Sequence, residues 1–444
     1  MTSPADHSHW HHRLAALAAE FGIPGASLAF SHRQGPIHTF AAGVLNRSTG
    51  ARVTADSLFQ IGSITKVWTA TQLTLLVEEG RIALDTPVVD VLPEFRVRDD
   101  EATQKITVRH LLTHTSGIDG DLFVDTGRGD DCLEKYVQAC AGLEQLFAPG
   151  DGQSYCNAAF VVAGRMVERL TELGWDDALR RQIVEPLGLT HTCTLPEDAL
   201  RYGTALGHDD DGAPVGTWGL PRSIGPAGLV CARAADVVEF GLAHLERGRL
   251  LADPEALRVP QVDVPNPHGD AEQWGLGWGL TTWDGQQVAF HGGDTIGQHA
   301  VLWVLPHAET VVALLTNGGR TFEFQHALAR EAFAELAQVS VPPPPTPPAR
   351  PVAAEPARHA GVYERAGSRL TASVREGGLW LRSEPTGALE GLAPSRDFPL
   401  TAIDEHTFLC RLDDASLWDA VVFETRPDGT AFLHYSGRAT PRVR

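Results

Sequence analysis

The residues best suited to nucleophilic chemistry are Ser63 and Lys66, which are separated by two positions. If residues 63–79 form the helix that their apolar pattern predicts, the two side chains share one face of it. A serine hydroxyl is a weak nucleophile until a nearby base takes its proton. A lysine amine can be that base once burial and a neighbouring positive charge lower its pKa. The pair therefore predicts acyl transfer through a serine ester, although so short a motif leaves open a helix start with a solvated lysine.

A second pattern, Tyr155-Cys156-Asn157, follows a glycine-rich turn and precedes a predicted helix over residues 158–172. We expect Tyr155 to carry protons and Asn157 to hydrogen-bond both Lys66 and a substrate amide. The structural alternative is a packed tyrosine followed by an asparagine that caps the next helix.

A third pattern, His291-Gly292-Gly293-Asp294, follows a predicted strand over residues 287–290. Gly292 and Gly293 would let a substrate backbone lie close against that strand, and His291 would face the tyrosine and tune it. Taken alone, a histidine in a glycine-rich turn is more often a purely structural feature.

These residues need a scaffold that brings positions 63, 155 and 291 together. Paired strands are predicted over residues 25–30 and 37–44, and further strands return after residue 277. Helices are predicted between them, with residues 133–146 and 175–184 among them. We therefore expect an α/β (α+β) fold, with one central antiparallel sheet assembled from both ends of the chain and a helical lobe beside it.

A proline-rich run, PPPPTPPARP at residues 342–351, marks the clearest domain boundary. It predicts a catalytic domain over residues 1–340, a linker over 341–355 and a small all-β barrel over 356–444.

Composition excludes several classes of partner. The net charge is −20, from 36 Lys and Arg against 56 Asp and Glu, which argues against nucleic acid and anionic membrane. The N-terminus lacks the basic region and unbroken apolar stretch of a secretory signal, so a cytoplasmic protein is expected. No Cys/His cluster has metal-binding spacing, and no metal or organic cofactor is expected.

Together, in this order, the three patterns resemble the serine β-lactamase family, which includes class C β-lactamases, D-alanyl-D-alanine carboxypeptidases, D-aminopeptidases and family VIII esterases. Five further segments carry the resemblance: LLTHTSG at 111–117, PLGL at 186–189, PAGL at 226–229, GLGW at 275–278 and LTNG at 315–318. The resemblance covers residues 10–340.

The resemblance implies roles for individual residues. Ser63 would form the acyl-enzyme, and Lys66 and Tyr155 would pass its proton to the leaving group and later activate the acceptor. The backbone N–H groups of Ser63 and Asp294 would form the oxyanion hole. His114, inside the LLTHTSG segment, is expected to be structural.

One departure from the family's pattern concerns substrate choice. β-Lactamases and transpeptidases carry Lys-Thr-Gly where this chain has His291-Gly292-Gly293. A neutral histidine binds a carboxylate less strongly than lysine does. Esters, thioesters or amides are therefore favoured over β-lactams, for which only weak activity is expected.

Two readings of the biological reaction follow from the resemblance. The preferred one is a stand-alone penicillin-binding-protein-type thioesterase of nonribosomal peptide assembly, with a small lipocalin-like C-terminal domain. It is preferred because the order of the three patterns and of the two domains is similar in such enzymes. It would take a peptidyl thioester, with a peptidyl carrier protein as a candidate partner, and release a head-to-tail macrolactam. The alternative is a family VIII-type esterase or D-aminopeptidase acting on small esters or amides. Arg438 is a candidate contribution of the small domain to substrate binding.

Overall fold

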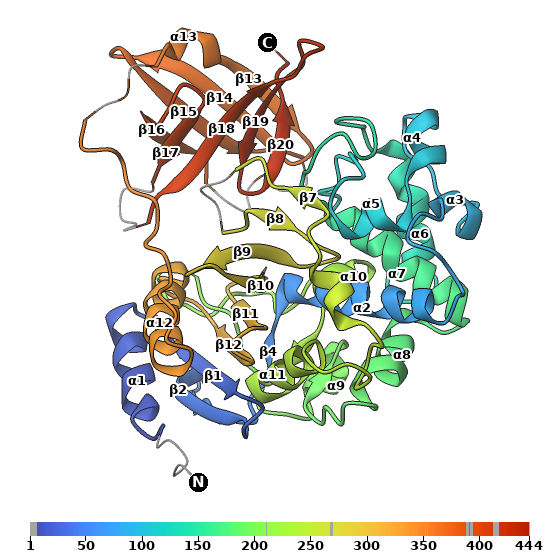
Figure 1. The fold of residues 1–444 in the computed structure, drawn as a ribbon, viewed down its shortest axis with the longest axis vertical. Helices are drawn as coiled ribbons and strands as arrows, with labels where there is room; N and C mark the ends of the chain where they lie inside the picture. The colour runs from blue at the N-terminus through green and yellow to red at the C-terminus, as the bar shows by residue number, and fades with distance from the viewer. Residues whose placement is uncertain are drawn as a thin grey trace.

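The computed structural model describes residues 7–209, 211–266, 270–350, 352, 354–387, 390, 394–411 and 417–443. Pro351 and Ala353 of the expected linker lie outside them, and the described linker residues up to 350 form neither helix nor strand. Within these ranges, no helix combines the length and apolar character needed to cross a bilayer. A large α/β part carries a smaller β domain above one end of its sheet (Figure 1).

The large part is organised around one antiparallel sheet of nine strands. In spatial order these are β3 (Ala51–Arg52), β2 (His38–Asn46), β1 (Gly25–His32), β12 (Thr310–Thr316), β11 (His299–Leu305), β10 (Gln286–Asp294), β9 (Gly279–Trp283), β8 (Gln273–Trp274) and β7 (Val262–Asp263). β1 pairs with β12, with Leu28 opposite Leu314. The prediction of one sheet built from both ends of the chain is therefore confirmed.

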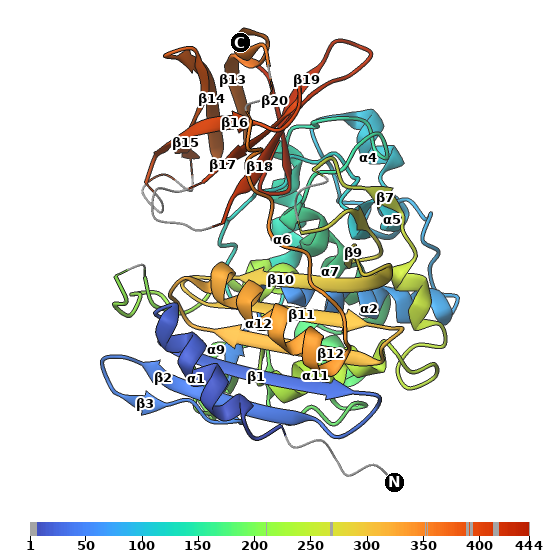
Figure 2. The same ribbon diagram turned by 60° about the vertical axis from the view of Figure 1, so that its left-hand side comes forward.

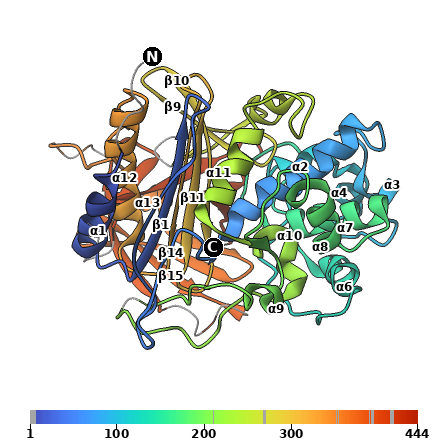
Figure 3. The ribbon, with the colours of Figure 1, turned by 90° about the horizontal axis from the view of Figure 1, so that it is seen from below.

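Helices cover both faces of this sheet. The terminal helices α1 (Trp10–Glu20) and α12 (Thr321–Leu336) lie side by side on one face, and α11 (Ala234–Ala243) lies on the other (Figures 2 and 3). Side chains such as Leu28, Phe30 and Leu314 pack under α1 and α12 in one apolar cluster. Because both faces are covered, β1 and β12 are buried along nearly their whole length.

The helical lobe lies beyond α11 and shares its core with the inner face of the sheet. Its helices are α2 (Thr65–Glu78), α3 (Val88–Val91), α4 (Asp100–Lys105), α5 (Val108–Leu112), α6 (Cys132–Ala139), α7 (Asn157–Thr171), α8 (Trp175–Leu179) and α10 (Gly225–Gly228). A three-stranded sheet, β4 (Phe59–Gln60), β6 (Cys231–Ala232) and β5 (Thr192–Cys193), leads into α2, with the short helix α9 (Pro196–Ala199) beside it.

The C-terminal domain is an eight-stranded antiparallel meander. After the short helix α13 (Pro356–His359) come β13 (Gly361–Arg365), β14 (Ser368–Arg375), β15 (Gly378–Pro385), β16 (Arg396–Ala402), β17 (Thr407–Cys410), β18 (Asp419–Thr425), β19 (Ala431–Tyr435) and β20 (Arg438–Pro441). A bridge between Tyr363 and Arg442 nearly closes it, around an apolar core of its own. The expected all-β fold is confirmed, while a lipocalin relationship stays a prediction.

Two predicted helices are shorter than expected. The helix predicted over residues 133–146 ends at Ala139, and after one 3₁₀ turn the chain becomes extended from Leu143. There it hydrogen-bonds to the segment after α5. The N–H of Leu146 donates to Gly117 O, and Gln145 forms an antiparallel β-bridge with Ile118. The helix predicted over 175–184 is α-helical only to Leu179 and then widens into a π turn. In the first case, tertiary pairing overrides local helical periodicity.

Candidate active site

Ser63 is positioned by a tight junction between a strand and a helix. β4 ends at Gln60, and a 3₁₀ turn over Gly62–Ile64 leads directly into α2. Gly62 has φ +51°, and a Cβ there would lie 2.6 Å from the backbone nitrogen of Asp294. Only glycine fits this position, because it allows both the left-handed backbone and the close approach.

Lys66 lies one turn further along and is completely buried. Its Nζ lies 2.9 Å from Ser63 Oγ and donates to Ala227 O at 2.8 Å. Burial, and then the positive charge of Arg438, lower the pKa of Lys66 well below its ordinary value. These effects favour the neutral amine, which has a lone pair for the serine proton.

Tyr155 lies over the same pair. Lys66 Nζ lies 4.8 Å from the Tyr155 ring centroid, and the Tyr155 hydroxyl is close enough to Ser63 for that residue to lower its pKa. Burial raises the pKa of Tyr155, while Ser63 and Arg438 act in the opposite direction. The phenol therefore stays protonated near neutral pH and can hand over a proton that it then recovers.

The ring of His114 packs against the ring of Tyr155. The two rings stack at 4.3 Å between centroids, and His114 Nδ1 accepts the backbone N–H of Cys156 at 3.0 Å. His114 is fully buried with φ +58°, and burial lowers its pKa well below the ordinary value. A neutral ring that contacts the Tyr155 segment agrees with the expected structural role.

His291 lies on β10, with its ring 6.2 Å from that of Tyr155 and 5.6 Å from that of Trp274. Its Nδ1 is hydrogen-bonded to Gly292 O, and its buried Nε2 has no partner among the described residues. Burial, followed by the charge of Lys66, lowers the pKa of His291 to about 3. The side chain is therefore neutral at physiological pH and supplies no positive charge for a substrate carboxylate.

The backbone of β10 passes directly against the start of α2. A Cβ on Gly293 would lie 1.9 Å from Ile61 O and 2.9 Å from the backbone nitrogen of Ser63. A Cβ on Gly62 would in turn meet the Asp294 nitrogen. The backbone N–H groups of Ser63 and Asp294 therefore lie close to each other. The Asp294 carboxylate itself is hydrogen-bonded to His299.

Asn157 begins α7 and differs from the expectation. Its Nδ2 donates to Asp121 Oδ1 at 2.9 Å, whereas the hydrogen bonds of Lys66 among the described residues go to Ser63 and Ala227. A buried carboxylate is a stronger acceptor than a neutral amine. The expected contact between Asn157 and Lys66 is thus replaced by one with a carboxylate that the sequence analysis did not single out.

Asp121 joins the two parts of the protein. Its carboxylate accepts from Arg438 Nε at 2.6 Å and from Arg365 Nη1 at 2.6 Å, both from the C-terminal domain. The side chain is only 5% exposed. Although burial acts against ionisation, the two arginines and Asn157 lower the pKa of Asp121 to about 2. Asp121 follows the 111–117 segment closely, but nothing in the sequence links it to either arginine.

The C-terminal domain also bonds directly to the Tyr155 segment. The N–H of Tyr155 donates to Gly437 O at 2.9 Å, and the N–H of Ala439 donates to Ser154 Oγ at 3.1 Å. The guanidinium of Arg438 lies 5.1 Å from the Tyr155 ring centroid. The turn between β19 and β20 therefore forms one wall of the candidate site.

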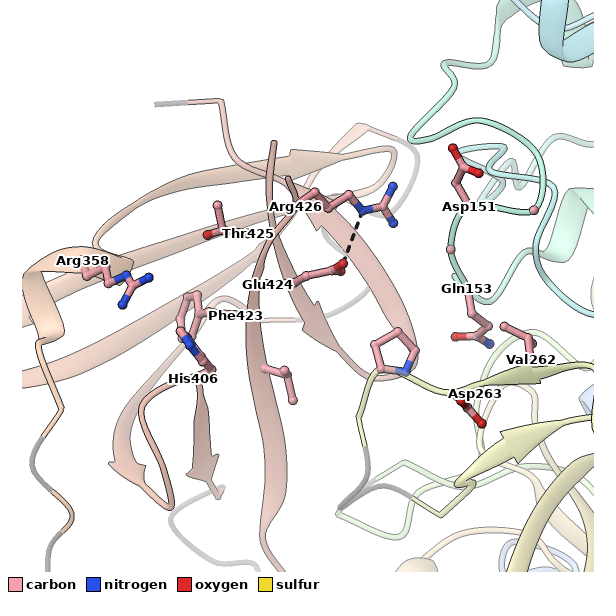
Figure 4. A pocket seen from close by; sticks show the side chains of 14 residues that line it. Asp151, Gln153, Val262, Asp263, Arg358, His406, Phe423, Glu424, Thr425 and Arg426 are labelled. Atoms are coloured by element: carbon pink, nitrogen blue, oxygen red, sulfur yellow. Dashed lines mark hydrogen bonds and ion pairs between the residues drawn. The ribbon is translucent and has the colours of Figure 1, made fainter. Parts of the chain in front are cut away.

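A separate pocket of about 630 Å³ opens between the two parts (Figure 4). On one side are residues 150–153, which precede Tyr155, and β7; on the other is β18 with Arg358 and His406. The guanidinium of Arg426 lies 4.8 Å from the Phe147 ring and 4.6 Å from the Phe432 ring. Neither Ser63 nor Lys66 lines this pocket, so it lies beside the candidate site and is not its centre.

The sheet, the helical lobe and the Ser63–Lys66–Tyr155 cluster define a serine hydrolase or acyltransferase of the β-lactamase-like α/β class. The chain belongs to the beta-lactamase family, whose model matches residues 11–337.

Relatives extend the likeness to the whole chain. Penicillin-binding protein 4 of Amycolatopsis lactamdurans is 47% identical over 380 residues, which cover 82% of this chain and 99% of that protein. The structure of SurE with D-Leu superposes with a TM-score of 0.78 at 26% identity and covers 98% of this chain and 100% of SurE. An unguisins hydrolase, ungD' of Aspergillus campestris, is 27% identical over 69% of this chain and 60% of its own length.

Proposed function

We propose that the protein is a serine acyltransferase that takes a peptidyl thioester onto Ser63 and releases it as a head-to-tail macrolactam. The observation that carries the proposal is the 2.9 Å separation between Ser63 Oγ and the fully buried Nζ of Lys66. A buried amine of lowered pKa beside a hydroxyl at a helix start is the chemistry that serine acylation requires.

In the first half-reaction, Lys66 Nζ takes the hydroxyl proton while Ser63 Oγ attacks the thioester carbonyl. The backbone N–H groups of Ser63 and Asp294 stabilise the oxyanion. When the tetrahedral intermediate collapses, the carbon–sulfur bond breaks. The leaving thiolate receives a proton from Tyr155, which recovers one from Lys66. The products are the Ser63 ester, a free thiol and a neutral Lys66.

In the second half-reaction, the amino group at the other end of the same peptide attacks the Ser63 ester. Its proton passes through Tyr155 and Lys66 to Ser63 Oγ as the ester bond breaks. An intramolecular amine can outcompete water because its effective concentration at the carbonyl is high. The β19–β20 turn, which hydrogen-bonds to the Tyr155 segment, supports this outcome by covering the site on one side.

A D-configured residue at the acyl position is part of the proposal. Its support is SurE, which was solved with D-Leu and resembles this chain over both domains. A peptidyl carrier protein remains the proposed donor of the thioester, and a cytoplasmic location remains a prediction from the sequence.

A hydrolase that resolves the same acyl-enzyme with water is the alternative. The likeness to an unguisins hydrolase supports this outcome. Efficient β-lactam hydrolysis is not proposed, because the neutral His291 offers no cation to a β-lactam carboxylate.

One assay separates the two outcomes. The protein is incubated with a pentapeptidyl thioester that ends in a D-residue, and the products are identified by mass spectrometry. The proposal predicts a product lighter than the linear acid by one water, and none with Ser63→Ala. Linear acid alone, formed in a Ser63-dependent way, would reject cyclisation and support the hydrolase. The isomer ending in the L-residue is the matched control and should react more slowly.

A further inference from the structure

Two cysteines face each other across a short strand pair next to the candidate site. Cys193 of β5 is the direct partner of Cys231 of β6 in the antiparallel register. Both are free thiols, and the Cys231 thiol donates to Leu229 O at 3.7 Å. Cys231 is 3% exposed, whereas Cys193 is half-buried.

The register fits a covalent bond between the two sulfurs. Directly opposed residues of an antiparallel pair have Cα atoms about 4.5 or 5.5 Å apart, according to their hydrogen-bonding position. Disulfides span Cα separations of about 4.4 to 6.8 Å. The strand pair therefore holds the two cysteines at a bridging distance without a change of register.

The position of β6 connects this pair to the nucleophile. On its other side β6 pairs with β4, where Cys231 is opposite Gln60. Val230, the residue before Cys231, accepts the N–H of Ile61 at 3.0 Å and donates its own to Thr65 Oγ1 at 3.1 Å. The segment closed by the two cysteines also contains Ala227, whose carbonyl accepts from Lys66.

We propose that Cys193 and Cys231 form a thiol–disulfide site, which closes reversibly into a bridge that fixes both ends of the 194–230 segment. The oxidant is a small disulfide such as glutathione disulfide. Cys193, as the thiolate, attacks one sulfur of the oxidant, which forms a mixed disulfide on Cys193 and releases the other half of the oxidant as a thiol. Cys231 then loses its proton, attacks the Cys193 sulfur and displaces the second thiol.

The two steps balance. Two S–H bonds of the protein are replaced by one S–S bond, and the oxidant is reduced to two thiols. The order of attack follows from exposure, since an external disulfide reaches the half-buried Cys193 before Cys231. The neighbouring Cys193 and burial both raise the pKa of Cys231 well above its ordinary value, in agreement with a resolving role.

Because the register already fits, closure should stabilise the fold and leave Ser63 and Lys66 in place. The full-length protein is incubated with glutathione disulfide, and its cysteines are mapped by peptide mass spectrometry. The expected result is a Cys193–Cys231 peptide lighter by two hydrogens, an upward shift of several degrees in Tm, and reversal of both by dithiothreitol.

The wild-type peptide map alone tests whether the Cys193–Cys231 disulfide forms, without any variant. A bridge between other cysteines, a glutathione adduct that persists on Cys193, or two unreacted thiols would each overturn the proposal. Cys193→Ser and Cys231→Ser should each abolish the Tm shift, whereas Cys410→Ser, in the C-terminal domain, should retain it. A shift that survives in Cys193→Ser would also contradict it.

Discussion

At the scale of single residues, the site depends on one amine that stays uncharged inside the protein. Lys66 has no exposed surface, and Arg438 adds a positive charge that lowers its pKa further. Asp121 acts in the opposite direction, but its carboxylate is held by Arg438 and Arg365. The balance favours neutral Lys66, and this is the state that can take a proton from Ser63.

The charge on Arg438 should be visible in the pH dependence of acylation. The rate rises with pH as Lys66 loses its proton and levels off above the Lys66 pKa. Arg438→Gln removes a charge that lowers this pKa, so the rising limb should move to higher pH. Arg438→Lys is the matched control and should shift it less. Stopped-flow measurements of acylation between about pH 5 and pH 10, at constant ionic strength, locate the rising limb of the rate. If this limb does not move in Arg438→Gln, the charge of Arg438 does not lower the pKa of Lys66.

The hydroxyl of Tyr155 should matter for rate and not for folding. Tyr155→Phe keeps the ring that stacks on His114 but removes the hydroxyl whose pKa Ser63 lowers. We expect acyl transfer to slow about 100- to 10,000-fold, the usual contribution of a general acid–base group. Steady-state kinetics and a melting curve test this together. A variant that turns over as fast as the wild type would remove Tyr155 from the mechanism.

At the scale of elements, the junction between β4 and α2 sets the position of the nucleophile. The sequence predicted a helix from residue 63 that stops at Gly80, and α2 with its preceding turn confirms it. The end of α6 was not predictable in the same way, because residues 143–146 pair with the segment around Gly117 and Ile118, which is distant in the sequence. Local patterns therefore identified the nucleophile's helix, whereas the lengths of other helices depended on tertiary pairing.

Gly62 and Gly80 offer a matched comparison at this scale. Both have positive φ, +51° and +70°, but a Cβ on Gly62 meets the Asp294 backbone while one on Gly80 meets nothing within 4 Å. Gly80→Ala should cost about 1–2 kcal/mol in the free energy of unfolding from backbone strain alone. Gly62→Ala should cost more and should also lose acylation, since Ser63 must shift. Equal costs from denaturant titrations would show that the close approach is unimportant.

At the scale of the whole molecule, the C-terminal domain completes the candidate site. The sequence predicted an all-β domain and singled out Arg438, but not its partner Asp121, 317 residues earlier. No spacing rule connects two charges so far apart, and only the docked domains bring them together. The hydrogen bond from Asn157 to Asp121 lies within the large domain, and it too depends on tertiary folding and not on a local pattern.

Removal of the Asp121 charge should weaken the contact between the domains. Asp121→Asn leaves two arginines without their buried counter-charge, which costs about 3–5 kcal/mol when a buried pair is broken. Asp198→Asn, which removes an exposed pair with Arg201, is the control and should cost about 0–1 kcal/mol. Chemical denaturation at neutral pH measures both. Similar small losses in the two variants would mean that Asp121 carries little of the domain contact.

The same carboxylate predicts an acid dependence of stability. Folding lowers the pKa of Asp121 from 3.8 to about 2, so its contribution is present above pH 4 and is lost as the pH falls through the folded value. The shift corresponds to about 2 kcal/mol. The difference in stability between wild type and Asp121→Asn should therefore narrow between about pH 4 and pH 2. A constant difference across this range would contradict the assignment.

The central claim is that Ser63 becomes acylated with Lys66 as its base, and intact-protein mass spectrometry tests it most directly. The protein is mixed with the D-terminated peptidyl thioester, quenched in acid on the millisecond scale and mapped by peptide digestion. We expect one acyl group on Ser63 in the wild type, none in Ser63→Ala, and an acylation rate reduced by orders of magnitude in Lys66→Ala. An adduct on another residue, or a Lys66→Ala variant that acylates at the wild-type rate, would contradict it.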